Sequence, residues 1–142
     1  MISKSSLHAV RALSALAMLP PDTFKGAAAL AEEIGAPKNY LGKLLQQLAQ
    51  ADLVRSQKGL GGGFALARDP SSITLYDVVE PIDRVSRWMH CFLGGKECSD
   101  QTACVIHFHW LTVRSTFMRF LSSVRISDLI GKDVRTIFHI DT

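Results

Sequence analysis

The alternation of apolar and polar residues predicts a mainly helical chain with one short β-hairpin. Apolar residues recur at the spacing of amphipathic helices in four segments: 7–17, 27–34, 37–50 and 75–82. Segments 53–56 and 64–67 alternate instead, and a glycine-rich loop separates them, which is typical of a hairpin. The expected fold class is therefore mainly α with a small β-hairpin.

Segment 37–50 predicts a helix with two very different faces. Its apolar stripe, at i, i+3, i+4 and i+7, consists of Leu41, Leu44, Leu45 and Leu48. Its opposite face is polar and free of acids, and consists of Lys38, Asn39, Lys43, Gln46, Gln47 and Gln50. Asn and Gln pair with adenine, and Lys reaches guanine or phosphate, so this face is suited to nucleic acid. Pro37 is expected at the first helical position, where its missing N–H costs nothing.

A shorter helix precedes this one, and the two form a helix-turn-helix. The shorter helix spans 27–34 and ends at Gly35. We interpret the basic, glycine-rich hairpin that follows as the wing of a winged helix. A nucleotide-binding P-loop is the alternative, but the chain lacks its GK[ST] signature and its strand–loop–helix context. The residues predicted to contact DNA are Lys38, Asn39, Tyr40, Lys43, Gln47, Gln57, Lys58 and Gly59.

Two further helices are predicted around this unit. Ser5 or Ser6 is expected to cap a first helix, which prolines end near residue 20. Thr74 and Asp77 have the spacing of a capping box with Asp in place of Glu. The short helix that they begin should be kinked or stopped by Pro81.

The last predicted element is a long helix from about Thr102 to Val124, after a loop over Arg84–Ala103. Its apolar positions follow the 4-3 spacing of coiled coils: Ile106, Trp110, Val113, Phe117, Phe120 and Val124. A second apolar face holds Phe108, Leu111, Met118 and Leu121. We expect one face to pack on its own domain and the other on a second copy, which gives a homodimer through residues 104–124. A central core helix in a monomer is the alternative.

Composition and charge fit a globular protein with an electropositive first half. Of the 142 residues, 47% are apolar and 20% are charged. Residues 1–68 hold eight basic and four acidic residues, a charge of +4, so a total of +3 leaves −1 for the remainder. The sequence shows neither a signal peptide nor a membrane-spanning run, so we expect a cytoplasmic protein. It also lacks the motifs of hydrolytic and nucleophilic catalysis, so we do not expect an enzyme.

Three cysteines and a histidine are grouped near the start of the long helix. They are Cys91, Cys98, Cys104 and His107, in the spacing C-x6-C-x5-C-x2-H. Cys104 and His107 are expected on one helix face, while the other two lie on a glycine-containing loop. Thiolates suit iron–sulfur clusters and zinc, although the C-x2-4-C knuckle of common zinc sites is absent. Three reduced thiols without a metal are the remaining alternative.

These motifs together resemble the Rrf-two family of bacterial repressors, which includes IscR, NsrR and RirA. The resemblance covers residues 1 to about 131 and rests on Ala9–Leu13, Leu30–Ile34, Tyr40-Leu41, Leu53-Val54, Gly59–Phe64, the cysteines and Cys104–Trp110. It implies a dimer on a double-stranded DNA operator, which we expect to be an imperfect palindrome. It also implies a [2Fe–2S] or [4Fe–4S] cluster on Cys91, Cys98 and Cys104 that reads redox state, nitric oxide or iron supply. The fourth ligand would be His107, or a residue such as His8 of the partner subunit.

The chain departs from IscR-like members at three places. The gap between the first two cysteines is one residue longer. Lys58-Gly59-Leu60 replaces Arg-Gly-Pro in the wing, and Gly42 replaces a Glu in the predicted 37–50 helix. The operator sequence therefore does not carry over.

We expect the chain to be divided into three parts. They are a winged helix-turn-helix domain (1–83), a cysteine-containing loop (84–103), and a dimerisation helix with its tail (104–142). The expected function is a transcriptional repressor that senses through an iron–sulfur cluster. The alternatives are a winged-helix regulator that uses free thiols or zinc, and a protein–protein adaptor.

Overall fold

The computed structural model describes residues 2–90, 92–93, 101, 103 and 105–130. The five α-helices of this part are α1 (Lys4–Ala17), α2 (Ala27–Ile34), α3 (Lys38–Gln50), α4 (Leu75–Asp83) and α5 (His107–Ser123). The two strands are β1 (Val54–Gln57) and β2 (Gly63–Leu66), and the 3-10 helices are η1 (Pro70–Ser72), η2 (Val85–Met89) and η4 (Ile126–Leu129). The predicted fold class, a winged helix-turn-helix with a long C-terminal helix, is confirmed.

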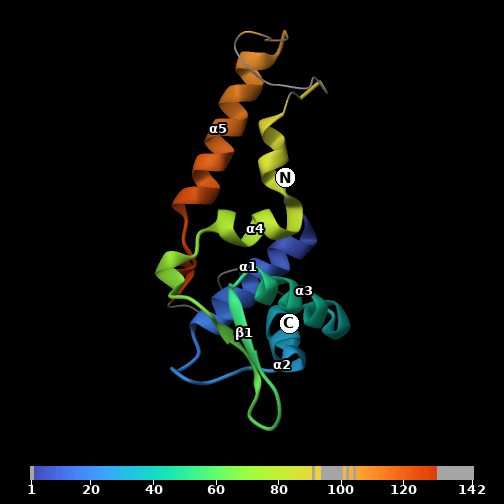
Figure 1. The fold of residues 1–142 in the computed structure, drawn as a ribbon, viewed down its shortest axis with the longest axis vertical. Coiled ribbons are helices and arrows are strands. Elements are labelled where there is room, and N and C mark those ends of the chain that lie inside the picture. Colours follow the sequence, from blue (N-terminus) through green and yellow to red (C-terminus); the bar gives the residue numbers. More distant parts are fainter. Residues whose placement is uncertain (1, 91, 94–100, 102, 104, 131–142) are drawn as a thin grey trace.

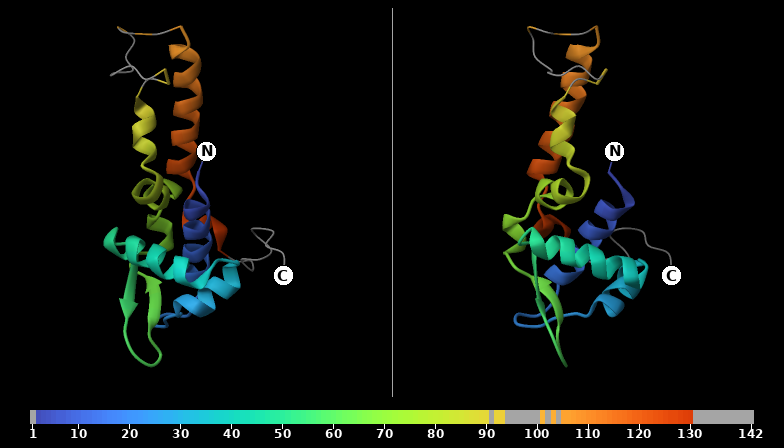
Figure 2. Two further views of the ribbon diagram at one scale, coloured as in Figure 1. Left: turned by 90° about the vertical axis from the view of Figure 1, so that its right-hand side faces the viewer. Right: turned by 45° about the vertical axis from the view of Figure 1, so that its right-hand side comes forward.

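The molecule has a broad end and a narrow end (Figure 1). Helices α1 to α3 and the β1–β2 hairpin form the broad end. Helix α5 and the segment that contains η2 run side by side away from it, and the other views show the same projection (Figure 2). Among the described residues, no helix is long and apolar enough to cross a membrane.

Helix α1 runs through the middle of the broad end and begins two or three residues earlier than predicted. Its cap is Ser3, whose hydroxyl accepts a hydrogen bond from the Ser6 N–H, so the prediction of Ser5 or Ser6 as the cap is wrong. Ser6 is instead buried within the helix and faces α4. The core around α1 includes buried leucines, an isoleucine and an alanine of α2 and α3, together with Val54 and Phe64 of the hairpin.

The helix-turn-helix has the predicted form. Helix α2 ends at Gly35, whose φ of 74° is the left-handed conformation that favours glycine. Pro37 is the residue that precedes the first turn of α3, with φ −65° and ψ 134°, rather than the first helical residue. The predicted leucine stripe of α3 is buried throughout, at Leu41, Leu44, Leu45 and Leu48.

The hairpin is held to the domain by a third extended segment that the sequence pattern did not indicate. Strands β1 and β2 are antiparallel, with Val54 opposite Leu66 and Gln57 opposite Gly63. The N–H of Lys25 donates to the Phe64 carbonyl at 2.9 Å, and the Phe64 N–H donates to the Lys25 carbonyl at 2.8 Å. This close approach needs Gly63, because a Cβ there would lie 2.4 Å from the Lys25 carbonyl oxygen.

Helix α4 begins with the predicted capping box and passes through Pro81. The Asp77 N–H donates to the Thr74 hydroxyl at 3.1 Å, and the Thr74 N–H donates to the Asp77 carboxylate at 2.9 Å. The helix ends at Asp83, two residues after the proline, and Arg84 adopts a left-handed φ of 50°. The region after Arg84 was predicted to be a loop, but Val85–Met89 forms the 3-10 helix η2, so that part of the prediction is wrong.

Helix α5 begins at His107, which is later than the predicted start near Thr102. Residues 105 and 106 form a turn, and Cys104 lies outside the described residues, so the expectation that Cys104 and His107 share one helix face stays a prediction. One face of α5 packs on α4 and η2, where Leu121 contacts Val79 and Val85. The chain after α5 returns to the broad end, since the Ile126 N–H donates to the Ile73 carbonyl at 2.9 Å.

The contact between Gly63 and Lys25 gives a test of the hairpin geometry. We expect Gly63→Ala to lower the free energy of unfolding by at least about 2 kcal/mol, because the new Cβ would strike the Lys25 backbone and φ is +137°. The matched control is Gly42→Ala, where a Cβ meets nothing within 4 Å. This control should raise stability by up to about 1 kcal/mol because it lies within a helix. Urea unfolding followed by circular dichroism measures both, and equal stability of the two variants would contradict the expectation.

Candidate nucleic-acid interface

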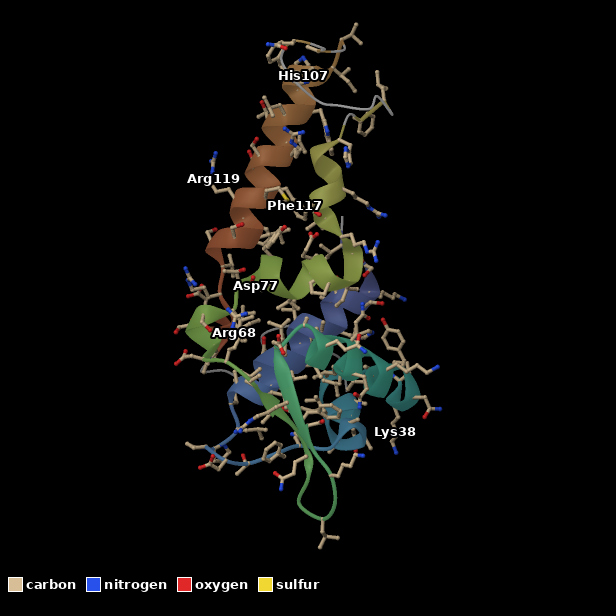
Figure 3. The ribbon with its side chains drawn as sticks, in the orientation of Figure 1. Lys38, Arg68, Asp77, His107, Phe117 and Arg119 are labelled. Atoms are coloured by element: carbon tan, nitrogen blue, oxygen red, sulfur yellow. The ribbon has the colours of Figure 1, made fainter. Side chains whose placement is uncertain are left out.

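The polar face of α3 lies on the surface of the broad end, away from the leucine stripe. Lys38, Asn39 and Lys43 are all exposed, and so are Gln46 and Gln50. Lys38 projects from the start of the helix (Figure 3). This face presents two ammonium groups and three amides and no carboxylate, as predicted from the sequence.

Tyr40 is turned back toward α1 rather than outward. Its hydroxyl is hydrogen-bonded to the Ser5 hydroxyl, and its ring meets the His8 ring edge-on, with centroids 5.9 Å apart. Burial, and then the positive charges of Arg11 and Lys4, lower the pKa of the His8 imidazole. His8 therefore packs as a neutral ring at neutral pH, and the Tyr40–Ser5 contact fixes the start of α3 against α1.

Gln47 is exposed but is engaged with α4. Its side-chain amide donates to the Pro81 carbonyl at 3.0 Å. That carbonyl lies in the last turn of α4, where carbonyls have no intrahelical donor. The side-chain amide of Gln47 thus holds the last turn of α3 against the end of α4, whereas Asn39 and Lys43 face outward.

The wing loop presents the other predicted contact residues. Gln57, Lys58 and Gly59 are exposed, and Gly59 has a φ of 91°. At the base of the hairpin, the Arg55 guanidinium lies 5.3 Å from the centre of the Phe24 ring, which holds it over the third extended segment. Residues 53–68 contain three basic residues and no acidic one, so the hairpin is electropositive.

The end of α4 is joined to the start of α1 through one carboxylate. Asp83 accepts hydrogen bonds from the Ser3 N–H at 2.9 Å and from the Ser6 hydroxyl at 2.7 Å. Burial raises the pKa of Asp83, but these hydrogen bonds and the charge of Arg87 lower it by more, so the net pKa lies below its ordinary value. The carboxylate is therefore ionised at neutral pH and joins α1 to α4 next to the projection.

The four candidate metal ligands fall largely outside the described residues. Cys91, Cys98 and Cys104 all lie outside them, and the described part of the chain contains no group of three His, Cys, Asp or Glu that could hold a metal ion. His107 is described: it is 2% exposed and packs edge-on against the Phe108 ring. It lies at the end of α5 that is remote from Lys38 (Figure 3).

Both ends of the cysteine-containing segment approach the first turns of α5. The Trp110 indole N–H donates to the His90 carbonyl at 3.1 Å, and His90 immediately precedes Cys91. Three residues after Cys104, the chain enters α5 at His107.

Sequence reasoning missed several residues of the interface and its support. Ser5 and Asp83 act by fixing α3 and α4 against α1, and no local pattern marks such long-range partners. Arg84 and Arg87 are exposed beside Pro81, in a region that was expected to be a loop. Leu60 is fully exposed in the wing loop, and its position between two glycines was the signal that could have identified it.

Comparison with known proteins agrees with this geometry. Residues 2–132 match the family described as "Rrf2: Iron-dependent Transcriptional regulator". The chain is 28% identical over 129 residues to the HTH-type transcriptional regulator IscR of Vibrio campbellii, which covers 91% of this chain and 76% of that protein. The prediction that the chain is not an enzyme is confirmed, because these matches are transcriptional regulators.

Two solved structures have the same fold. One is T. potens IscR, with a TM-score of 0.73 and 26% identity over 91% of this chain and 85% of that one. The other is CymR, the global cysteine regulator of B. subtilis, with a TM-score of 0.74 and 22% identity over 91% of this chain and 95% of that one. The family match covers residues 2–132, and the chain folds as a winged helix-turn-helix like these relatives. The chain therefore belongs to the Rrf2 family of transcriptional regulators, which is the Rrf-two family that its sequence motifs resemble.

Proposed function

We propose that this regulator is a homodimeric repressor that binds an imperfectly palindromic DNA operator and senses through an iron–sulfur cluster. The observation that carries the proposal is the separation of two features on one chain. An acid-free α3 face and a basic wing lie at the broad end. His90 and His107, which flank the stretch of sequence with the three cysteines, lie at the other end of the molecule, by the first turns of α5.

The dimensions of α3 fit the major groove of DNA. A helix with its side chains is about 10–12 Å across, and the groove is about 12 Å wide. The outward residues Asn39 and Lys43 would face base edges or phosphates, while Lys38 and the wing residues Gln57, Lys58 and Gly59 would contact the backbone or the minor groove. Tyr40 and Gln47 are engaged with α1 and α4, so their contribution would be to set the angle of α3, with any DNA contact secondary.

The contribution of the lysines is tested by removing their charges. Lys43→Ala and Lys58→Ala should each weaken DNA binding and make the salt dependence shallower by about one unit in the slope of log K against log salt. The charge-matched control is Arg119→Ala, since Arg119 is exposed on α5 and points away from the broad end (Figure 3). Fluorescence anisotropy with a selected duplex at several salt concentrations measures the slope. If the double lysine variant keeps the affinity and slope of the wild type, the proposed interface is wrong.

The apolar surface of α5 supports a dimer. Val113 and Phe120 are each 50% exposed on the 4-3 stripe, while Phe117 is half-buried against α4. The stripe continues into an apolar cavity of about 310 Å³ between α1, α4 and α5. The cavity is lined by Ile2, Leu7, Val10, Leu75, Val79, Phe117, Phe120 and Leu121. A second copy would cover this surface, because 4-3 spacing is suited to packing between helices.

The dimer is tested at the most exposed aromatic residue of the stripe. Phe120→Glu should shift the protein from dimer to monomer, because burying an unpaired carboxylate costs several kcal/mol. Ser122→Glu places the same charge at an exposed position of α5 off the stripe and should stay dimeric. Light scattering of both variants at equal concentration measures the mass. Phe120→Glu is preferred to Phe117→Glu because Phe117 also packs within its own chain.

The donor set fits a cluster. Three cysteine thiolates and one imidazole are suited to iron–sulfur clusters, and T. potens IscR shares the fold at 26% identity. Cys91, Cys98 and Cys104 would hold the cluster, with His107 or a residue of the partner such as its His8 as the fourth ligand. A bound cluster would supply a centre whose gain, loss or oxidation changes the chain at the tip of α5. A tenfold change in DNA affinity requires a difference of only about 1.4 kcal/mol between the two states.

The cluster is tested by anaerobic reconstitution of Cys98→Ala and Cys104→Ala. Each variant should lose bound iron and sulfide and the visible absorption, and its DNA affinity should no longer change between reconstituted and untreated protein. Full retention of iron and sulfide in both variants would rule out these ligands. A wild type that binds zinc, or that responds to thiol oxidation without iron, would instead favour sensing without a cluster.

A further inference from the structure

The wing carries an apolar side chain at its apex. Leu60 has a relative exposure of 105%, the highest among the exposed large apolar residues of the described chain. It lies between Gly59 and Gly61, which both have positive φ, at 91° and 74°. The hairpin is the part of the broad end that extends furthest from α5 in every view (Figures 1 and 2).

The turn below Leu60 is tightly constrained. The Gly62 N–H donates to the Gly59 carbonyl at 3.0 Å. A Cβ on Gly62 would lie 2.2 Å from the Gln57 carbonyl oxygen, so the backbones of the two loop arms are in close contact. Gly63 is likewise held against Lys25. A loop built in this way presents residue 60 on a narrow, supported tip.

The charge of the hairpin suits a polyanion as the partner of Leu60. Lys58 is exposed in the same loop, Arg55 lies at the base of the hairpin, and residues 53–68 contain no acidic residue. An apolar tip on a basic hairpin beside a helix-turn-helix has the features of the side chains that enter the DNA minor groove and separate base steps. That groove is about 6 Å wide, too narrow for a helix but wide enough for the edge of a turn.

We propose that Leu60 inserts into the minor groove and partly unstacks one base step beneath each wing. This inference rests on the proposed DNA-binding function and adds a residue that determines specificity. Leucine has no hydrogen-bonding group, so it cannot read base edges directly. It selects sequence through deformability, since pyrimidine–purine steps such as TA and CA/TG unstack most easily. The operator therefore contains such a step at the same distance outside each half-site.

The experiment uses full-length wild type and Leu60→Ala in parallel selections from a randomised duplex pool. The wild type is expected to enrich a TA or CA/TG step symmetrically outside the two half-sites. Leu60→Ala should select the same half-sites without that flanking enrichment. The affinities of the wild type for duplexes with a TA step and with a stiff AA step at that position should then differ by about fivefold or more. The variant should bind the two duplexes with equal affinity.

Two controls separate Leu60 from the charge of the wing. Lys58→Ala should weaken binding to both duplexes alike and make the salt slope shallower, whereas Leu60→Ala should leave the slope unchanged. A 2-aminopurine placed in the flanking step should brighten when the wild type binds, and should not brighten with Leu60→Ala.

The outcomes distinguish the two proposals. If the wild type selects no sequence and binds duplex DNA without salt dependence, the proposed function fails, and the role of Leu60 fails with it. If the wild type selects half-sites but Leu60→Ala matches it in flanking preference and fluorescence, only the role of Leu60 is overturned. Loss of dimer mass in Leu60→Ala would also overturn it, because the tip would then contact protein.

Discussion

The packing of α1 is the constraint on which the other elements depend. Its inward positions include Ala9, Ala12 and Ala15, each 3% exposed or less, and the small Ser14. Small side chains allow neighbouring backbones to approach closely, so α2, α3, α4 and β2 can all contact this one helix. Because α1 is shared, the positions of the reading helix and of α4 are not independent. A larger residue at any of these sites would separate several elements at once.

Two polar contacts add to that packing beside the candidate interface. Tyr40 is hydrogen-bonded to Ser5 of α1, and Gln47 donates a hydrogen bond to the Pro81 carbonyl of α4, so α3 is held at its first and last turns. Asp83 in turn ties the end of α4 to the start of α1. These four hydrogen bonds join α1, α3 and α4 beside the point where the chain leaves the domain toward η2 and α5. A displacement of α4 would therefore reach α3 through a direct contact.

Local sequence signals predicted the local features of this fold. The leucine stripe of α3, the capping box of α4 and the glycine-rich hairpin all depend on residues within a few positions of one another. The pairing of Lys25 with Phe64 and the contacts of Ser5 and Asp83 join residues far apart in the sequence, and periodicity carries no information about such partners. The later start of α5 was missed because the absence of Gly and Pro permits a helix without requiring one.

In the candidate site too, the sequence predicted the features that depend on helix periodicity but not those that depend on neighbouring helices. The exposure of Lys38, Asn39 and Lys43 follows from their places opposite the stripe, so the face of α3 could be predicted. Tyr40 and Gln47 lie near the edge of that face, where a neighbouring helix decides whether a side chain faces outward or packs inward. Here α1 and α4 engage both residues, and sequence spacing alone could not show this.

The winged helix at the broad end has a well-buried core, whereas α5 has few buried side chains of its own. In α5, the 17 residues from His107 to Ser123 include three buried side chains, His107, Arg114 and Leu121, whereas most of α1 is buried. Helices of this length gain most of their stability from packing, and aromatic and β-branched residues in α5 add little propensity. Covering the exposed stripe would therefore stabilise α5 more than any element of the winged helix. Because α5 has few buried side chains of its own, a small change in free energy at this element has a larger effect on structure than the same change within the core of the winged helix.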